Sequence, residues 1–169
     1  LRSLVGSEMC IRDSMKAVVN GKIVLKNGVL ENKVIVFDKK IIDICDEVPT
    51  NCEIIDAKEN YVCPGLIDIH IHGCKGFDAM DEDENAVEII SKGLAETGVT
   101  SFLPTTMTMS PERIYKAFDN IIKAKNKSIK GAKVLGAHME GPFINEKYKG
   151  AQNPKYIYCL LYTSDAADE

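Results

Sequence analysis

Short apolar runs separated by turn-forming dipeptides fill the first part of the chain, residues 15–64. One of these runs, VIVF at residues 34–37, is rich in β-branched side chains, and similar short runs lie on both sides of it. The dipeptides Asn20-Gly21 and Asn27-Gly28 are of the kind that closes β-hairpins. This pattern predicts a small antiparallel β domain.

Residues 65–158 follow a different pattern, in which apolar segments alternate between strand and helix periods. Val87, Ile90 and Leu94 fall at i, i+3 and i+7, which predicts a helix in the stretch DENAVEIISKGLAETG. A second helix is predicted to begin at Ser110-Pro111, because serine is a favoured N-cap residue and proline a favoured first helical residue.

Three further apolar runs, LIDIHIHG, VTSFLPTT and KVLGAHME, are separated by these two helices. Strands that alternate with helices through short connections are typical of parallel sheets with crossover helices. We therefore predict an α/β fold for residues 65–158, either part of a (β/α) barrel or an open α/β sheet.

All three histidines of the chain lie at the ends of predicted strands. His70 and His72 stand in the first strand, and His138 precedes Glu140 by two residues in the third. Side chains two apart in a strand share a face, and active sites of parallel α/β folds lie at the carboxyl ends of strands. Two imidazoles and a carboxylate suit zinc, or iron or manganese. The alternatives are hydrogen-bonded structural histidines, or chance spacing.

Composition narrows the classes of function. With 45% hydrophobic and 27% charged residues the chain can bury a core, and a net charge of −4 does not favour nucleic-acid binding. No apolar run approaches the roughly 20 residues that span a bilayer, and no basic-then-apolar leader opens the chain. Six cysteines without a C-x-x-C pair are typical of thiols in a reducing compartment. We expect a cytoplasmic protein that binds neither nucleic acid nor membranes.

Both ends of the chain differ from the rest. The stretches LVGSEMCIRDS near the start and CLLYTSDAADE at the end resemble translated sequencing-adaptor sequence, and neither keeps a helix or strand period. We expect residues 1–14 and 159–169 to be adaptor-like extensions, Met15 to be the natural start, and the chain to be a fragment that ends near Tyr158. The alternative is a native extension and tail.

Three stretches carry a family resemblance: PGLIDIHIHGCKGFD, GVTSFLPTT and AHMEGPFINEKYKGAQNP. From residue 15 to about residue 157 the chain resembles the N-terminal portion of the N-acetylglucosamine-6-phosphate deacetylase family of amidohydrolases. The pattern PG-x-ID-x-H-x-HG is shared across the superfamily, whereas H-x-EGPF-x-N followed by KGA is specific to this family.

The resemblance implies a fold and a site. The fold is about three strands of a (β/α)8 TIM-type barrel in residues 65–158, with part of a small β-sandwich in residues 15–64. Glu140 matches the family's metal-binding glutamate, and His70 and His72 match the histidine pair that binds a second metal in many members. The backbone of Ala151 matches a contact to the sugar. His138 is expected to be structural, and the family's acid/base aspartate is expected outside this chain.

The implied reaction is a metal-dependent hydrolysis that removes the acetyl group from N-acetylglucosamine 6-phosphate. The cofactor is a divalent metal, with zinc favoured and iron or manganese as alternatives. The full-length protein is expected to be a homo-oligomer, and the fragment itself to be inactive. The alternatives are another amidohydrolase, acting on a cyclic amide or deaminating a purine, and a non-catalytic truncated fragment.

Overall fold

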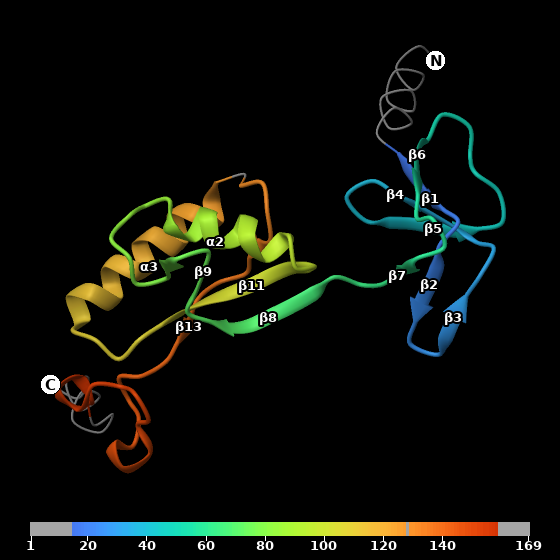
Figure 1. The fold of residues 1–169 in the computed structure, drawn as a ribbon. Helices are drawn as coiled ribbons and strands as arrows, with labels where there is room; N and C mark the ends of the chain where they lie inside the picture. The colour runs from blue at the N-terminus through green and yellow to red at the C-terminus, as the bar shows by residue number, and fades with distance from the viewer. Residues whose placement is uncertain (1–14, 128, 159–169) are drawn as a thin grey trace, which may run out of the picture. The chain divides into compact units, whose positions relative to one another are not determined.

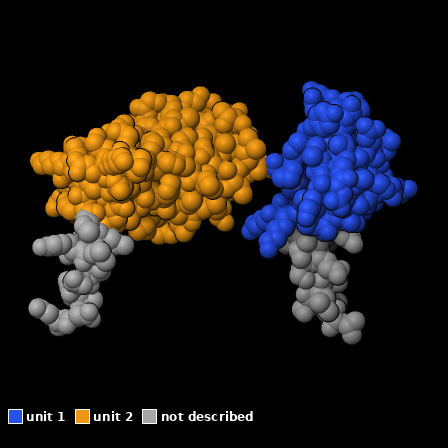
Figure 2. All heavy atoms as spheres, turned by 90° about the horizontal axis from the view of Figure 1, so that it is seen from below, with its two compact units in different colours: residues 1–64 blue, residues 65–169 orange. Residues whose placement is uncertain are grey.

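The computed structural model describes residues 15–127 and 129–158. The chain divides after Pro64 into two compact units (Figure 2), each of which is described by itself. The regular elements of unit 1 are strands, whereas unit 2 combines strands with the two α-helices of the described residues. Neither of these helices has both the length and the apolar character needed to cross a bilayer.

Unit 1 contains two small sheets (Figure 1). In the larger sheet β1 lies between an antiparallel β4 and a parallel β6, and β5 pairs antiparallel with the other edge of β4. In the smaller sheet β2 lies between an antiparallel β3 and a parallel β7. The bounds are β1 Lys16–Val19, β2 Lys22–Leu25, β3 Gly28–Leu30, β4 Val34–Phe37, β5 Ile41–Cys45, β6 Glu53–Asp56 and β7 Tyr61–Val62.

The prediction of an antiparallel domain is wrong in part, because β1–β6 and β2–β7 are parallel pairs. Asn27-Gly28 does close a hairpin, in which Leu25 lies opposite Gly28. Asn20-Gly21 instead leads from one sheet to the other: Asn20 has a φ of 53°, and its Nδ2 donates to Asp56 Oδ1 at 3.1 Å. A Cβ at Gly21 would lie 2.6 Å from Val62 Cγ2, so glycine permits the close approach of β7.

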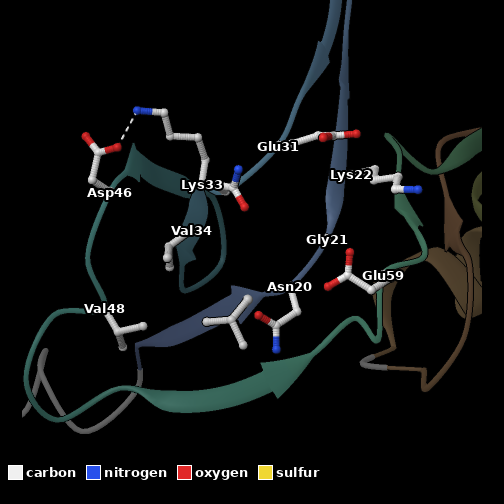
Figure 3. A pocket seen from close by; sticks show the side chains of 11 residues that line it. Asn20, Gly21, Lys22, Glu31, Lys33, Val34, Asp46, Val48 and Glu59 are labelled. Atoms are coloured by element: carbon white, nitrogen blue, oxygen red, sulfur yellow. Dashed lines mark hydrogen bonds and ion pairs between the residues drawn. The ribbon is translucent and has the colours of Figure 1, made fainter.

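A hollow of about 310 Å³ lies in unit 1 and is lined largely by polar side chains (Figure 3). Its charged lining residues carry both signs, and an ion pair of 2.5 Å joins Lys33 Nζ to Asp46 Oδ1. This mixture gives the hollow no preference for an anion or a cation. None of the site residues predicted from the sequence lines it.

Unit 2 is built around β11, which pairs in parallel with β8 on one side and with β12 and β13 on the other. The two helices follow β8 and β11 in the chain and cover the same face of the sheet (Figure 1). The bounds are β8 Leu66–Ile71, β9 Gly73–Cys74, β10 Phe77–Asp78, α2 Ala86–Ala95, β11 Val99–Thr106, α3 Pro111–Asn126, β12 Lys133–Val134 and β13 His138–Met139, followed by the 3-10 helices η1 Glu146–Tyr148 and η2 Pro154–Tyr156.

Both predicted helices are confirmed. The apolar face of α2 is buried, and the chain turns away from the helix at Gly98, which has a φ of +86°. The second helix begins at Pro111 with Ser110 as its N-cap. The predicted third strand is divided, because the chain leaves the strand at Gly136 between β12 and β13. Glycine, which has no side chain to pack, weakens a strand at such a position.

The core of unit 2 lies between the sheet and the helices. Phe102 of β11, Ile90 of α2 and Ile121 of α3 are at most 2% exposed and belong to one apolar cluster. Burial of side chains of this size contributes roughly 1.5–3 kcal/mol each. The helices therefore fix β11, and β11 in turn fixes the ends of β8 and β13, where the histidines lie.

Candidate metal centre

The parallel pairing of unit 2 brings two strand ends together. His70 lies within β8 and His72 one residue after it, while Glu140 directly follows β13. β11 pairs with both strands near their carboxyl ends, with Pro104 opposite Ile71 in β8 and Thr105 opposite His138 in β13. His70 and Glu140, which are 70 positions apart in the sequence, therefore meet where the parallel strands end.

Three ligand atoms converge at this edge. Glu140 Oε2 lies 2.8 Å from His72 Nε2 and 3.2 Å from His70 Nε2. The two imidazole Nε2 atoms are 3.4 Å apart. All three side chains are partly exposed, so the site is open to solvent and to small ligands.

The hydrogen bonds around His72 determine which ring nitrogen is free. Its Nδ1 lies 3.2 Å from the backbone oxygen of Thr105, and a carbonyl oxygen can only accept a hydrogen bond. The proton therefore sits on Nδ1, which leaves the Nε2 lone pair directed toward Glu140. The Thr105 hydroxyl in turn accepts from the backbone N–H of Ile71 at 3.0 Å, which ties β11 to the end of β8.

His138 lies beside this cluster and is not one of its three members. Its ring packs edge-to-face on that of His70, with centroids 4.5 Å apart, and its Nδ1 lies 3.5 Å from the hydroxyl of Thr105. These contacts support the orientation of the His70 ring. Asp68 accepts a hydrogen bond from the backbone N–H of His70 at 3.0 Å, so it stabilises the strand backbone rather than a ring.

The carboxylate of Glu140 is kept charged by its surroundings. Burial acts to raise its pKa, but polar contacts with Gln152 and His70 and the electrostatic effect of the neighbouring His72 and His70 rings outweigh burial and lower the pKa. The backbone oxygen of Glu140 also accepts from the Thr108 hydroxyl at 3.2 Å. The glutamate is thus held at both its backbone and its side chain.

The donor set fits a divalent cation. Two ligands about 2.1 Å from a tetrahedral zinc ion lie roughly 3.4 Å from each other. The two imidazole nitrogens have this spacing, and Glu140 Oε2 lies somewhat closer, at 3.2 Å from His70 and 2.8 Å from His72. Two neutral nitrogens and one carboxylate oxygen, with the tautomer of one ring already fixed, suit zinc and other divalent transition metals. The arrangement leaves further coordination positions on the open side.

Comparison with known proteins adds to this geometry. Residues 61–157 match the Amidohydrolase family. The chain belongs to the amidohydrolase family. Amidohydrolases are metal-dependent enzymes, so the cluster of two histidines and a glutamate lies in a family that uses such ligands.

Individual relatives share more than the family. The N-acetylglucosamine-6-phosphate deacetylase of Bacillus subtilis (strain 168) is 39% identical over an alignment of 147 residues that covers 83% of this chain and 36% of that protein. The enzyme of the same name from Vibrio furnissii is 43% identical over 94 residues, 56% of this chain and 24% of that protein. This amidohydrolase chain therefore spans about a third or less of the length of these relatives.

Among solved structures, the N-acetylglucosamine-6-phosphate deacetylase from Pasteurella multocida matches with a TM-score of 0.78 and 30% identity, over 91% of this chain and 42% of that chain. The likeness and the parallel strands of unit 2 confirm the predicted fold class, part of a (β/α) barrel with part of a small β domain. The adaptor-like stretches predicted at 1–14 and 159–169 lie outside the described residues.

The remaining predicted site residue, Ala151, lies in the loop between η1 and η2. It lines a cavity of about 310 Å³ together with Gln152 and with Thr108, whose hydroxyl donates to the backbone oxygen of Glu140. Sequence reasoning missed Thr108 and Gln152. A threonine just past a strand and a glutamine in a polar loop carry no periodic signal, and only their contacts reveal a role.

Proposed function

We propose that this chain supplies part of the active site of a hydrolase that removes the acetyl group from N-acetylglucosamine 6-phosphate, giving glucosamine 6-phosphate and acetate. The observation that carries the proposal is the meeting of His70, His72 and Glu140 at the carboxyl ends of parallel strands, in a family whose similar members bear that name. Nothing in the geometry favours a cyclic amide or a purine.

The proposed roles of the residues follow from their contacts. His70, His72 and Glu140 hold the cation, with zinc favoured because two imidazoles and a carboxylate are a common zinc ligand set, and iron or manganese as alternatives. When bound by these residues, a divalent cation would supply Lewis-acid chemistry, polarising the amide carbonyl and lowering the pKa of a water molecule toward roughly 7. Thr105, through its carbonyl oxygen, keeps the Nε2 atom of His72 free of a proton.

The proposed place of the sugar is the cavity that Ala151 lines with Thr108, whose hydroxyl donates to the backbone oxygen of Glu140. Ala151 is exposed, and its small side chain leaves its backbone open to contact by a hydroxyl group. At about 310 Å³ the cavity is at the lower end of the range for small-molecule sites. The family resemblance implies an acid/base aspartate that we expect outside this chain, so we expect no turnover by the 169-residue chain itself.

A chimera tests this proposal. Residues 15–158 would replace the matching segment of the B. subtilis deacetylase, which is 39% identical to this chain. We expect the chimera to release acetate from N-acetylglucosamine 6-phosphate, and the same chimera with Glu140→Gln to lose this activity. A folded chimera that releases no acetate, or that instead releases ammonia from adenine, would refute the proposal.

The unfused chain is the second arm of this experiment. It should show no acetate release above that of its own Glu140→Gln variant, and turnover above that level would contradict the inactivity expected of the fragment. The homo-oligomeric state and the cytoplasmic location stay predictions.

A further inference from the structure

Gln152 is a buried polar side chain in contact with Thr108, the residue that donates to the backbone of Glu140. It is only 4% exposed, although it belongs to an otherwise polar loop between η1 and η2. Its Oε1 accepts a hydrogen bond from the backbone N–H of Thr108 at 2.8 Å, and its Nε2 lies 3.6 Å from the sulfur of Met107. Burial of an amide group is costly unless its hydrogen bonds are made, so these contacts fix its position.

The contact with Thr108 also determines which way the amide points. A backbone N–H can be accepted only by the amide oxygen, so the Nε2 group must face away from Thr108. Its Nε2 group lies against the sulfur of Met107 instead. The single orientation of this amide therefore holds the backbone of Thr108 in place.

Thr108 in turn holds the candidate ligand Glu140. Its hydroxyl donates to the backbone oxygen of Glu140 at 3.2 Å, and Thr108 is 1% exposed. Gly141, which follows Glu140, has a φ of +77°, and a Cβ there would lie 1.9 Å from the Thr108 hydroxyl oxygen. The backbone from the Glu140 carbonyl to Gly141 is therefore packed against Thr108.

The geometry points to Gln152 and Thr108 as positioning residues that hold Glu140 in the orientation needed to bind the metal. Gln152 fixes the backbone of Thr108, and the Thr108 hydroxyl fixes the backbone of Glu140. This inference rests on the proposed metal centre. It assigns a role to Gln152, a loop residue more than ten positions after Glu140, and to Thr108, which follows β11.

Metal binding by the 169-residue chain tests the inference without need of activity. The probe is Co²⁺ alone, whose visible absorption reports both binding and ligand geometry. Gln152→Leu removes the amide that accepts from the Thr108 N–H and puts an apolar side chain of similar size in its place, and we expect it to weaken Co²⁺ affinity by about 10- to 100-fold and to alter the absorption band. Asn153→Ala is the matched control, because Asn153 caps η2 through the backbone N–H of Lys155 and makes no hydrogen bond to Glu140.

A second pair of variants covers the case in which Gln152→Leu does not fold, as judged by circular dichroism. Thr108→Ser keeps the hydroxyl, whereas Thr108→Val keeps the shape and loses the hydrogen bond to Glu140. We expect near-normal Co²⁺ affinity for the serine variant and weakened affinity for the valine variant.

The outcomes of these measurements distinguish the proposed metal centre from the positioning role of Gln152 and Thr108. If the unsubstituted chain binds Co²⁺ and Glu140→Gln does not, while folded Gln152→Leu or Thr108→Val binds with normal affinity and spectrum, the positioning role is overturned and the metal centre stands. A loss of affinity in Asn153→Ala equal to that in Gln152→Leu would also overturn it, since the effect would then belong to the loop as a whole. An unsubstituted chain that binds no Co²⁺ would refute both the metal centre and the positioning role.

Discussion

Replacing Gly141 by alanine is a sharp test of the way Glu140 is held. Gly141 has a φ of +77°, and placing alanine in this left-handed region costs about 1–3 kcal/mol. Its new Cβ would also lie 1.9 Å from the Thr108 hydroxyl oxygen and 3.0 Å from the Thr108 Cβ. Relief of that overlap costs roughly another 1–3 kcal/mol, and it must displace Thr108 or Glu140.

Gly76 offers a matched control within unit 2. Its φ is +81°, but a Cβ there would meet no atom within 4 Å. Gly76→Ala therefore carries the backbone cost alone, and the difference between the two variants isolates the overlap with Thr108.

The assay combines urea unfolding with titration of zinc. We expect Gly76→Ala to lower the free energy of unfolding and to leave zinc affinity unchanged. Gly141→Ala should lower the free energy of unfolding further and also weaken zinc binding, because the metal ligand is its direct neighbour. Equal losses of stability in the two variants, together with equal zinc affinities, would show that the packing of Thr108 against this segment does not hold the ligand.

Three further outcomes are expected. Phe102→Ala, at a site with no exposure, should lower the free energy of unfolding of unit 2 by about 3–5 kcal/mol, whereas Phe143→Ala, at a site 41% exposed, should cost far less; urea unfolding distinguishes them. The pKa of Asp56 is lowered by a hydrogen bond from the backbone N–H of Lys58 and one from the side chain of Asn20. The charged carboxylate therefore stabilises the fold above the pKa that Asp56 has in the unfolded chain, and this contribution is lost as the pH falls through the lower pKa of the folded state. The free energy of unfolding, measured across this pH range, should depend less steeply on pH in Asp56→Asn. Zinc at about 100 times its dissociation constant should raise the free energy of unfolding by roughly 2.7 kcal/mol, an effect that a chelator or His72→Asn removes, and thermal unfolding that ignores zinc would count against the site.

Where one periodic signal governed a segment, the sequence was sufficient to predict its structure. The 3.6-residue spacing of Val87, Ile90 and Leu94 predicted α2, and all three side chains are buried. The i, i+2 spacing of His70 and His72 predicted a shared face, and the two Nε2 atoms lie 3.4 Å apart. In both cases the local period determines the direction of the side chain whatever the rest of the chain does.

Features that depend on distant partners could not be read in this way. Asn20-Gly21 has the composition of a hairpin turn, yet the strands that flank it pair with different neighbours because β6 and β7 arrive from later in the chain. Gln152 resembles a solvated loop residue until Thr108, 44 positions earlier, is seen to fix its amide. The contacts that position the candidate ligands join residues far apart in the sequence, so composition and spacing could not predict them.

The exposed apolar side chains of β8 should determine whether the chain self-associates in solution. Ile67 and Ile69 are 62% and 67% exposed, and within the described residues this strand pairs only with β11. An exposed apolar strand with a free edge is a template for pairing with another copy. We therefore expect the chain to self-associate as its concentration rises.

Substitution of both isoleucines by lysine should suppress this association, because two like charges at the edge would repel the same strand of a second copy. The fold should survive, since neither side chain is buried, whereas lysine at Ile71, which packs against the core of unit 2, should destabilise that unit. Sedimentation velocity and circular dichroism distinguish these effects. If the unsubstituted chain stays monomeric at high concentration, or the double lysine variant associates to the same extent, then the free edge of β8 is not the surface that drives association.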